Sequence, residues 1–311
     1  MKNIYKYFIK LFGIIIFSYI LIKTDWIELK KVFLNTDILS LLPIYFLIVP
    51  NDLINSFRWH YILNSLGIKR KYLNNVKLFL SGFLAGIITP GRIGEFYKLF
   101  RIKKEGYSPL KGALSIGLMK LLNIFILFFM SIPAIFIIGI KRNYNSGMIL
   151  KNSLLASAFF LFLIFISLIF KKKTAQFISL ILIRFFKTDV KEDALFKQLK
   201  KFNLSFILIL LFLTIVRWSI FFSQIYFIAI IIGIKVPFFT MYFILALVTL
   251  ISSLPITVMG IGTREAALIF SLSVFNITKE KSLALSLFIY TIFILNVIIA
   301  TIFWHIEHKD L

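Results

Sequence analysis

The sequence predicts an all-α polytopic membrane protein, with about six spanning helices and two re-entrant helical hairpins arranged as an inverted repeat. Three observations predict it. Hydrophobic residues make up 60% of the 311 residues, and the mean hydropathy is +0.94. Several apolar runs reach about 18 residues, which is long enough to cross a bilayer. A set of motifs also recurs in both halves. We expect one transmembrane domain, 1–311, with halves at roughly 1–145 and 146–311.

The apolar runs define the elements in chain order. We expect spanning helices at 4–22, 38–63, 112–140, 148–170, 204–234 and 282–303. Two pairs of shorter arms are expected at 73–88 with 93–103 and at 238–254 with 263–275. Arm 93–103 is too short and too charged to cross about 30 Å of hydrocarbon. We interpret each pair as a re-entrant hairpin, because irregular backbone at membrane depth is tolerated only inside protein or beside a water-filled cavity.

The basic residues set the orientation. The formal net charge is +23, but no nucleic-acid motif is present, and cytoplasmic loops of membrane proteins collect Lys and Arg. If the helices alternate, most basic clusters fall on one side, including the loop 171–201. We therefore expect a multi-pass protein of the cell (plasma) membrane with both termini in the cytoplasm. The absence of cysteine excludes disulfides and thiolate metal sites, and we expect no metal or cofactor.

Four features recur in the same order in the two halves. They are an Arg-Trp pair (at Arg58 and Arg217), a proline (Pro90 and Pro255), a glycine turn ending in Glu ("GRIGE" and "GIGTRE"), and a helix start rich in small residues ("SPLKGALSIGL" and "TKEKSLALSLF"). The predicted topology makes the halves antiparallel. Inverted repeats with Gly/Pro-broken segments are typical of transporters, which bind substrate near the midplane. The alternative is a duplication retained only as a scaffold.

The broken segments carry the candidate site. Pro and Gly end a helical arm and permit a tight turn, and backbone N–H groups at such a turn can bind an anion. We expect the two turns to meet near the midplane in a basic pocket for a lipid phosphate. The candidate substrate-binding residues are Arg58, Pro90, Gly91, Arg92, Gly94, Glu95, Lys120, Arg217, Gly260, Gly262, Arg264 and Glu265.

Arg217 lies in the middle of its predicted helix, where a charge is costly, so we expect it to face a partner or a cavity. Asp52 and Glu95 are its candidate partners. Glu95 and Glu265 can orient the neighbouring arginines or pair with Arg217 and Arg58. For Arg92 and Arg264, the alternative is that they snorkel to the membrane surface.

The run "RW…PGRIGEFYK" followed by "LP…GIGTREAAL" resembles the lysylphosphatidylglycerol synthetase transmembrane-region family, also called flippase-like. The resemblance covers nearly the whole chain. It implies lipid translocation between leaflets, or a part in aminoacyl-lipid or lipid-linked glycan pathways. Many members show Arg-x-x-Asp in the third helix, where this chain has Lys120-x-x-Asn123. The synthetase activity needs a soluble transfer domain, for which the seven residues after Trp304 leave no room, so we do not expect it here.

The sequence thus predicts a passive or gradient-coupled lipid translocase. Its substrate would be a phosphate-bearing lipid, either an anionic phospholipid or a polyprenyl-phosphate-linked glycan precursor. One alternative is a membrane-embedded transferase that uses Glu95, Glu265 or Asp52 as a base. Another is an accessory subunit in an aminoacyl-lipid or envelope-glycan pathway. The sequence leaves open a homo-oligomer or an envelope-biosynthesis partner, and it contains no nucleotide-binding motif, which favours a role other than enzyme.

Overall fold

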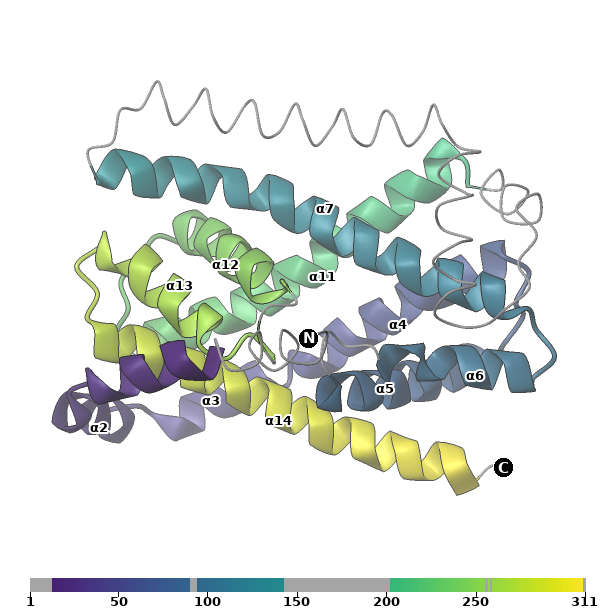
Figure 1. The fold of residues 1–311 in the computed structure, drawn as a ribbon, viewed down its shortest axis with the longest axis horizontal. Helices are drawn as coiled ribbons and strands as arrows, with labels where there is room; N and C mark the ends of the chain where they lie inside the picture. Colours follow the sequence, from purple (N-terminus) through teal and green to yellow (C-terminus); the bar gives the residue numbers. More distant parts are fainter. Residues whose placement is uncertain (1–12, 90–93, 143–201, 255–256, 258, 310–311) are drawn as a thin grey trace, which may run out of the picture.

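The computed structural model describes residues 13–89, 94–142, 202–254, 257 and 259–309 (Figure 1). Within these ranges all the regular secondary structure is helical. Four helices there are long and apolar enough to cross a membrane: Ile38–Ser65, Pro109–Lys141, Leu204–Ile231 and Lys279–Ile306. The predicted class, an all-helical membrane protein, is confirmed. The expected span 148–170 lies outside the described residues, and so does the first part of 4–22.

The helix bounds follow the apolar runs closely. The helices are α2 (Trp26–Leu34), α3 (Ile38–Tyr45), α4 (Ile48–Ser65), α5 (Tyr72–Ile88), α6 (Tyr97–Lys104), α7 (Pro109–Lys141), α11 (Leu204–Ile231), α12 (Phe238–Ser252), α13 (Thr263–Ser273) and α14 (Lys279–Lys309). Two features differ from the expectation. The span expected at 38–63 is divided into α3 and α4, because Pro50 has no N–H to donate to the carbonyl of Phe46. Helix α2 was not expected; the side chain of Asp25 caps its first turn.

The order and lengths of the helices repeat in the two halves. The segment from α3 to α4 covers 28 residues, and α11 also covers 28. Next comes a shorter helix, α5 with 17 residues or α12 with 15. A short second arm follows, α6 with 8 residues or α13 with 11. A long helix ends each set, α7 with 33 residues and α14 with 31. This succession supports a duplication, whereas the opposite orientation of the halves stays a prediction.

The long helix α14, yellow in Figure 1, connects the two hairpins. Helix α13 packs against α14 on the left of the view, and α5 packs against it on the right. Helix α12 packs against α7. The tryptophans of the two Arg-Trp pairs lie in two different apolar clusters, Trp59 in one and Trp218 in the other, and each cluster takes residues from both halves. The repeated tryptophans are therefore core residues, and the arginines beside them are placed by that packing.

Candidate functional site

The turn between α12 and α13 depends on two glycines. Gly260 and Gly262 have φ of +77° and +83°, a left-handed conformation that glycine adopts without a steric cost. Gly262 also lies against the backbone of Gly13, where an added Cβ would come 2.1 Å from the carbonyl oxygen. Its N–H donates to Glu265 Oε2 at 2.6 Å, which caps the first turn of α13. Both predicted glycines are therefore required by the backbone conformation of the turn, and Gly262 also by its close contact with Gly13.

Glu265 connects this turn to α14. The residue is fully buried. Its Oε1 accepts from the hydroxyl of Ser286 at 2.6 Å and from that of Tyr290 at 2.9 Å, while Oε2 accepts from Gly262. Both carboxylate oxygens are therefore occupied by donors of the fold. The hydrogen bonds described for Glu265 link the turn to α14, and the expectation that Glu265 orients arginines stays a prediction.

Arg264 is buried beside the same helix. Its side chain donates to the carbonyl of Met259 at 2.8 Å, and its guanidinium lies 4.6 Å from the ring centre of Tyr290 and 4.9 Å from that of Phe293. Only 6% of the residue is exposed. A cation enclosed by rings and a carbonyl is held inside the protein, so the snorkelling alternative does not describe Arg264.

The turn between α5 and α6 is described in part. The candidates Pro90, Gly91 and Arg92 lie outside the described residues. Gly94 crosses close to α5, since a Cβ on it would come 1.9 Å from the carbonyl oxygen of Ala85. Its N–H donates to Thr89 Oγ1 at 2.6 Å. This glycine is required for a close approach between the two arms of its own hairpin.

Glu95 and Lys120 form an ion pair beside this turn. Their nearest atoms are 3.5 Å apart, and the side chains are 16% and 37% exposed. The ammonium of Lys120 also lies over the ring of Phe96 at 5.7 Å. Lys120 belongs to α7, the long helix that follows the hairpin. The first turn thus carries a pair of opposite charges that remains partly accessible.

Sequence reasoning missed Lys98, which is the most deeply enclosed lysine of the described residues. It is 3% exposed, and its ammonium lies 5.1 Å from the ring centre of Trp59 and 4.6 Å from that of Phe79. Gly82 leaves room for its stem, because a Cβ there would come 2.7 Å from Lys98 Cγ. The available signal was its position three residues after Glu95 within the hairpin motif.

Arg58 links α4 to α7. The residue is fully buried, and its guanidinium donates to Asn55 Oδ1 at 3.0 Å and to Asn123 Oδ1 at 3.2 Å. Asn123 stands where the resemblance places an acidic residue in many members. The amide oxygen accepts from Arg58 without neutralising it. The contact with Asn123 therefore does not neutralise the positive charge of the buried Arg58.

Asp52 on α4 is buried and interacts with residues of α14 and α11. Its Oδ1 accepts from the amide of Asn296 on α14 at 3.2 Å. The positive charge of Arg217 on α11 lies within electrostatic range of this carboxylate. The guanidinium of Arg217 also lies 3.7 Å from the ring centre of Trp218. Of the two candidate partners named for Arg217, the structure places Asp52 near it.

One face of α14 connects these groups. Its residues at intervals of three and four contact Glu265, then Arg264, then Asp52; they are Ser286, Tyr290, Phe293 and Asn296. At 1.5 Å per residue, Tyr290 and Asn296 are about 9 Å apart along the axis. The second turn and the centre at Asp52 therefore belong to one site. A meeting of this site with the first turn stays a prediction.

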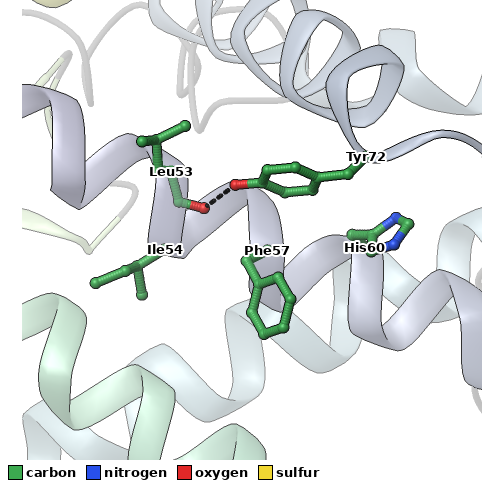
Figure 2. A pocket seen from close by; sticks show the side chains of 5 residues that line it. All are labelled: Leu53, Ile54, Phe57, His60 and Tyr72. Carbon is green, nitrogen blue, oxygen red and sulfur yellow. Dashed lines mark hydrogen bonds between the residues drawn. The ribbon is translucent and has the colours of Figure 1, made fainter.

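An open groove lies on the other side of α4 (Figure 2). It has a volume of about 450 Å³ and is lined by Leu53, Ile54 and Phe57, with His60 and Tyr72 at one end. The hydroxyl of Tyr72 donates to the carbonyl of Leu53 at 2.8 Å, which fixes α5 against α4. Leu53 and Phe57 are 42% and 44% exposed. The groove is therefore an apolar surface turned outward.

The described residues contain no group of three His, Cys, Asp or Glu side chains that could hold a metal ion. A comparison with curated proteins finds no match. A comparison with protein families matches residues 8–301 to the family described as the lysylphosphatidylglycerol synthase TM region. The match covers both hairpins and both Arg-Trp pairs, the features on which the resemblance was based. This chain therefore belongs to the lysylphosphatidylglycerol synthase TM region family.

Proposed function

We propose that this protein is a lipid translocase, which moves a phosphate-bearing lipid or lipid-linked glycan precursor between the leaflets of the cell membrane. One observation carries the proposal: the described interior holds more cationic than anionic side chains around its two broken helix pairs. The cations are Arg58, Lys98 and Arg264, which are buried, and Lys120 and Arg217, which are partly buried; the carboxylates are the buried Asp52 and Glu265 and the partly buried Glu95. A lipid phosphate supplies the missing negative charge and accepts strong, charge-assisted hydrogen bonds.

The cost of these cations supports a functional role. An ionisable side chain at membrane depth costs about 2.5–3.5 kcal/mol even on the lowest scales. Arg58 is fully buried, and the hydrogen bonds that its guanidinium donates go to the neutral amide oxygens of Asn55 and Asn123. A fold that needed only packing would be served by an apolar residue at this position. Charges that stabilise little in the resting protein are explained by a ligand that they bind.

The groove on α4 offers a place for the rest of the lipid. Leu53 and Phe57 line an outward, apolar surface, whereas Asp52 and Arg58 on the same helix are buried inside the bundle. A translocase must pass a polar headgroup through its interior while the acyl chains stay in hydrocarbon. Helix α4 separates two such environments, so we place the acyl chains along the groove and the headgroup among the buried cations.

The state of Glu265 favours transport over group transfer. A general base must have an oxygen available to the proton that it abstracts. Both oxygens of Glu265 accept from protein donors, and the residue is fully buried. Of the three carboxylates considered for a transferase, this one therefore has a structural role. We also propose the predicted topology, with both termini cytoplasmic and an anionic phospholipid or polyprenyl-phosphate-linked lipid as partner.

The experiment is a translocation assay on the purified chain in phosphatidylcholine vesicles. Trace fluorescent phosphatidylglycerol, phosphatidylcholine or polyprenyl phosphate is added in separate samples, and an impermeant reductant bleaches the outer leaflet. We expect bleaching beyond the outer-leaflet fraction, faster for the two anionic lipids than for phosphatidylcholine. Bleaching equal to that of protein-free vesicles for all three lipids would contradict the proposal.

A matched pair of arginine variants tests the site. Arg264→Gln should slow translocation of the anionic lipids at least about tenfold, the factor that corresponds to about 1.4 kcal/mol. Arg142→Gln is the control, because Arg142 also lies over an aromatic ring, at 4.0 Å from the centre of Phe270, and donates to that residue's carbonyl at 3.3 Å. Arg142 caps the end of α7 and contacts the last turn of α13, whereas Arg264 lies in the first turn of α13. Equal rates in the two variants would remove Arg264 from the site.

A further inference from the structure

We propose that Asp52 and Asn296 form an intramembrane proton-binding site, and that its protonation is coupled to lipid movement. The first part stands on the geometry of the site. The second part rests on the proposed function. Together they assign the driving force, a proton gradient, to a specific pair of side chains.

The geometry leaves two oxygens without a donor. Asp52 and Asn296 are 9% and 8% exposed, so each is more than nine-tenths buried. Their one described hydrogen bond runs from Asn296 Nδ2 to Asp52 Oδ1, at 3.2 Å. The other oxygen of each side chain, Asp52 Oδ2 and Asn296 Oδ1, is buried and has no hydrogen-bond partner. A buried acceptor without a donor costs about 1–3 kcal/mol, and more when it is charged.

One proton satisfies both oxygens. When it binds to Asp52 Oδ2, the carboxylate becomes a carboxylic acid with one O–H donor. That donor and Asn296 Oδ1 are complementary, and together with the existing N–H···O bond they make the paired ring of two hydrogen bonds that an acid and an amide form. No covalent bond other than the O–H forms, and none breaks. The neutral pair also removes the cost of a carboxylate in hydrocarbon.

The charged group beside Asp52 favours its other form, the ionised carboxylate. Arg217 from α11 is the charge that acts on Asp52 among the described residues, and it favours the ionised carboxylate. Next to Asp52 on α4 lies the neutral Asn51, whose own Oδ1 is also unpartnered. Helix α5 contributes the hydroxyl of Tyr72, which donates to the carbonyl of Leu53.

Two other cations on α4 and α7 have described partners of their own. Arg58 on α4 donates to two asparagines, and Lys120 on α7 pairs with Glu95. The carboxylate therefore has two stabilised forms, ionised with Arg217 or protonated with Asn296. A metal cation fits this site less well than a proton, because it would lie beside a guanidinium.

Coupling follows from charge. Protonation of Asp52 removes a negative charge beside Arg217, which strengthens the attraction of Arg217 for a lipid phosphate. Release of the proton restores the carboxylate, which competes with the phosphate. The lipid anion and the proton are thus expected to bind together and leave together.

The first test measures proton binding on the protein itself. Infrared difference spectra of the purified chain are recorded between neutral and acidic pH. We expect the C=O stretch of a buried carboxylic acid, absent from Asp52→Asn and present in Glu95→Gln. If Asp52→Asn does not fold, Asn296→Leu provides the same information, because loss of the amide partner should move the band to the frequency of an unpaired acid. A band that is absent from the parent, or unchanged in the folded variants, overturns the site.

The second test measures coupling, with fluorescent phosphatidylglycerol in the vesicle assay. A pH gradient should accelerate translocation in the direction of proton flow and slow it when reversed, and Asp52→Asn should respond to neither gradient. Equal rates under opposite gradients overturn the coupling and leave the proton site to the infrared result. A complete lack of translocation overturns the proposed function, and the coupling with it, while the infrared band still decides the site.

Discussion

The two hairpin turns end in the same sequence pattern but are held in different ways. In the second turn, the carboxylate of Glu265 is fully buried and accepts three hydrogen bonds from the fold. In the first turn, Glu95 faces Lys120 at 3.5 Å, and both side chains remain partly exposed. The shared sequence pattern, a Gly-rich turn ending in Glu, therefore specifies a turn but does not specify which contacts hold its glutamate. The second turn is anchored, whereas the first has a charge pair that a ligand can reach.

In both halves, the partner of the turn's glutamate comes from the same position in the repeat. Tyr290 lies on the long helix after the second hairpin, 25 residues beyond Glu265. Lys120 lies on the long helix after the first hairpin, also 25 residues beyond its glutamate. A neutral hydroxyl in one half thus corresponds to an ammonium in the other. The repeat preserves the geometry of the contact, and the difference in chemistry separates an anchoring turn from one that can respond to an anion.

The largest expected effect is the presence or absence of labelling, in a test of whether the two hairpins open to opposite sides of the membrane. The inverted repeat puts the loop after α6 in the cytoplasm and the loop after α13 outside. Lys104→Cys and Asn276→Cys in this cysteine-free chain place one thiol on the last residue of α6 and one in the loop after α13, both at exposed positions. An impermeant maleimide added to intact cells should label position 276 and leave position 104 unlabelled until the cells are opened. Labelling of both from outside would end the inverted model.

The next largest effect compares the two glutamates. Glu265→Ala leaves three donors without an acceptor, two of them buried and Tyr290 partly buried, so it should lower the free energy of unfolding by about 3 kcal/mol or more. Glu95→Ala removes a partly exposed ion pair with Lys120, which is worth about 0–1 kcal/mol, and an electrostatic attraction to the buried Lys98, so its loss should be the smaller of the two. Thermal unfolding in detergent measures both, and the circular dichroism of each variant before heating reports whether it has folded. Equal losses would mean that the first turn is anchored as firmly as the second.

The sequence predicted the helices far better than the contacts between them. Apolar runs and Gly/Pro positions fix where helices such as α5 and α12 begin and end, so these bounds agree within a few residues. The donors to Glu265 could not be predicted, since Ser286 and Tyr290 reach it only through the packing of α13 on α14. Nothing in the sequence distinguishes Asn296 from other polar residues, and only the packing of α14 shows that it lies beside Asp52. Side-chain partners depend on helix packing, which apolar runs do not specify.

A smaller effect concerns the glycines of the turns. Gly262 and Gly106 share a φ of +83°, but a Cβ would meet the Gly13 backbone at the former and nothing within 4 Å at the latter. Gly106→Ala should therefore cost only the left-handed conformation, about 1–2 kcal/mol. Gly262→Ala should cost about 2–4 kcal/mol, because steric overlap adds to it. The midpoints of thermal unfolding compare the two variants. If Gly106→Ala lowers the midpoint as much as Gly262→Ala does, the close contact between Gly262 and the Gly13 backbone adds nothing to the cost.

The smallest expected change in stability comes from a position at which the halves differ in chemistry alone. Lys98 and Leu268 each follow the glutamate of their turn by three residues, and they are 3% and 0% exposed. Replacing a buried ion with a well-packed apolar residue is often neutral or stabilising, by about 1–4 kcal/mol. Lys98→Leu copies the second half onto the first, and it should raise the midpoint of unfolding slightly or leave it unchanged.

The same variant should slow translocation of fluorescent phosphatidylglycerol at least about tenfold, or about 1.4 kcal/mol. The reason is that the ammonium of Lys98 is buried between Trp59 and Phe79, where a charge is costly and attracts a lipid phosphate strongly. Lys103→Leu, on the exposed side of the same helix, is the control and should alter neither measurement. If Lys98→Leu instead unfolds the chain while Lys103→Leu does not, the ammonium stabilises the first hairpin, and that turn is anchored by its lysine as the second is by its glutamate.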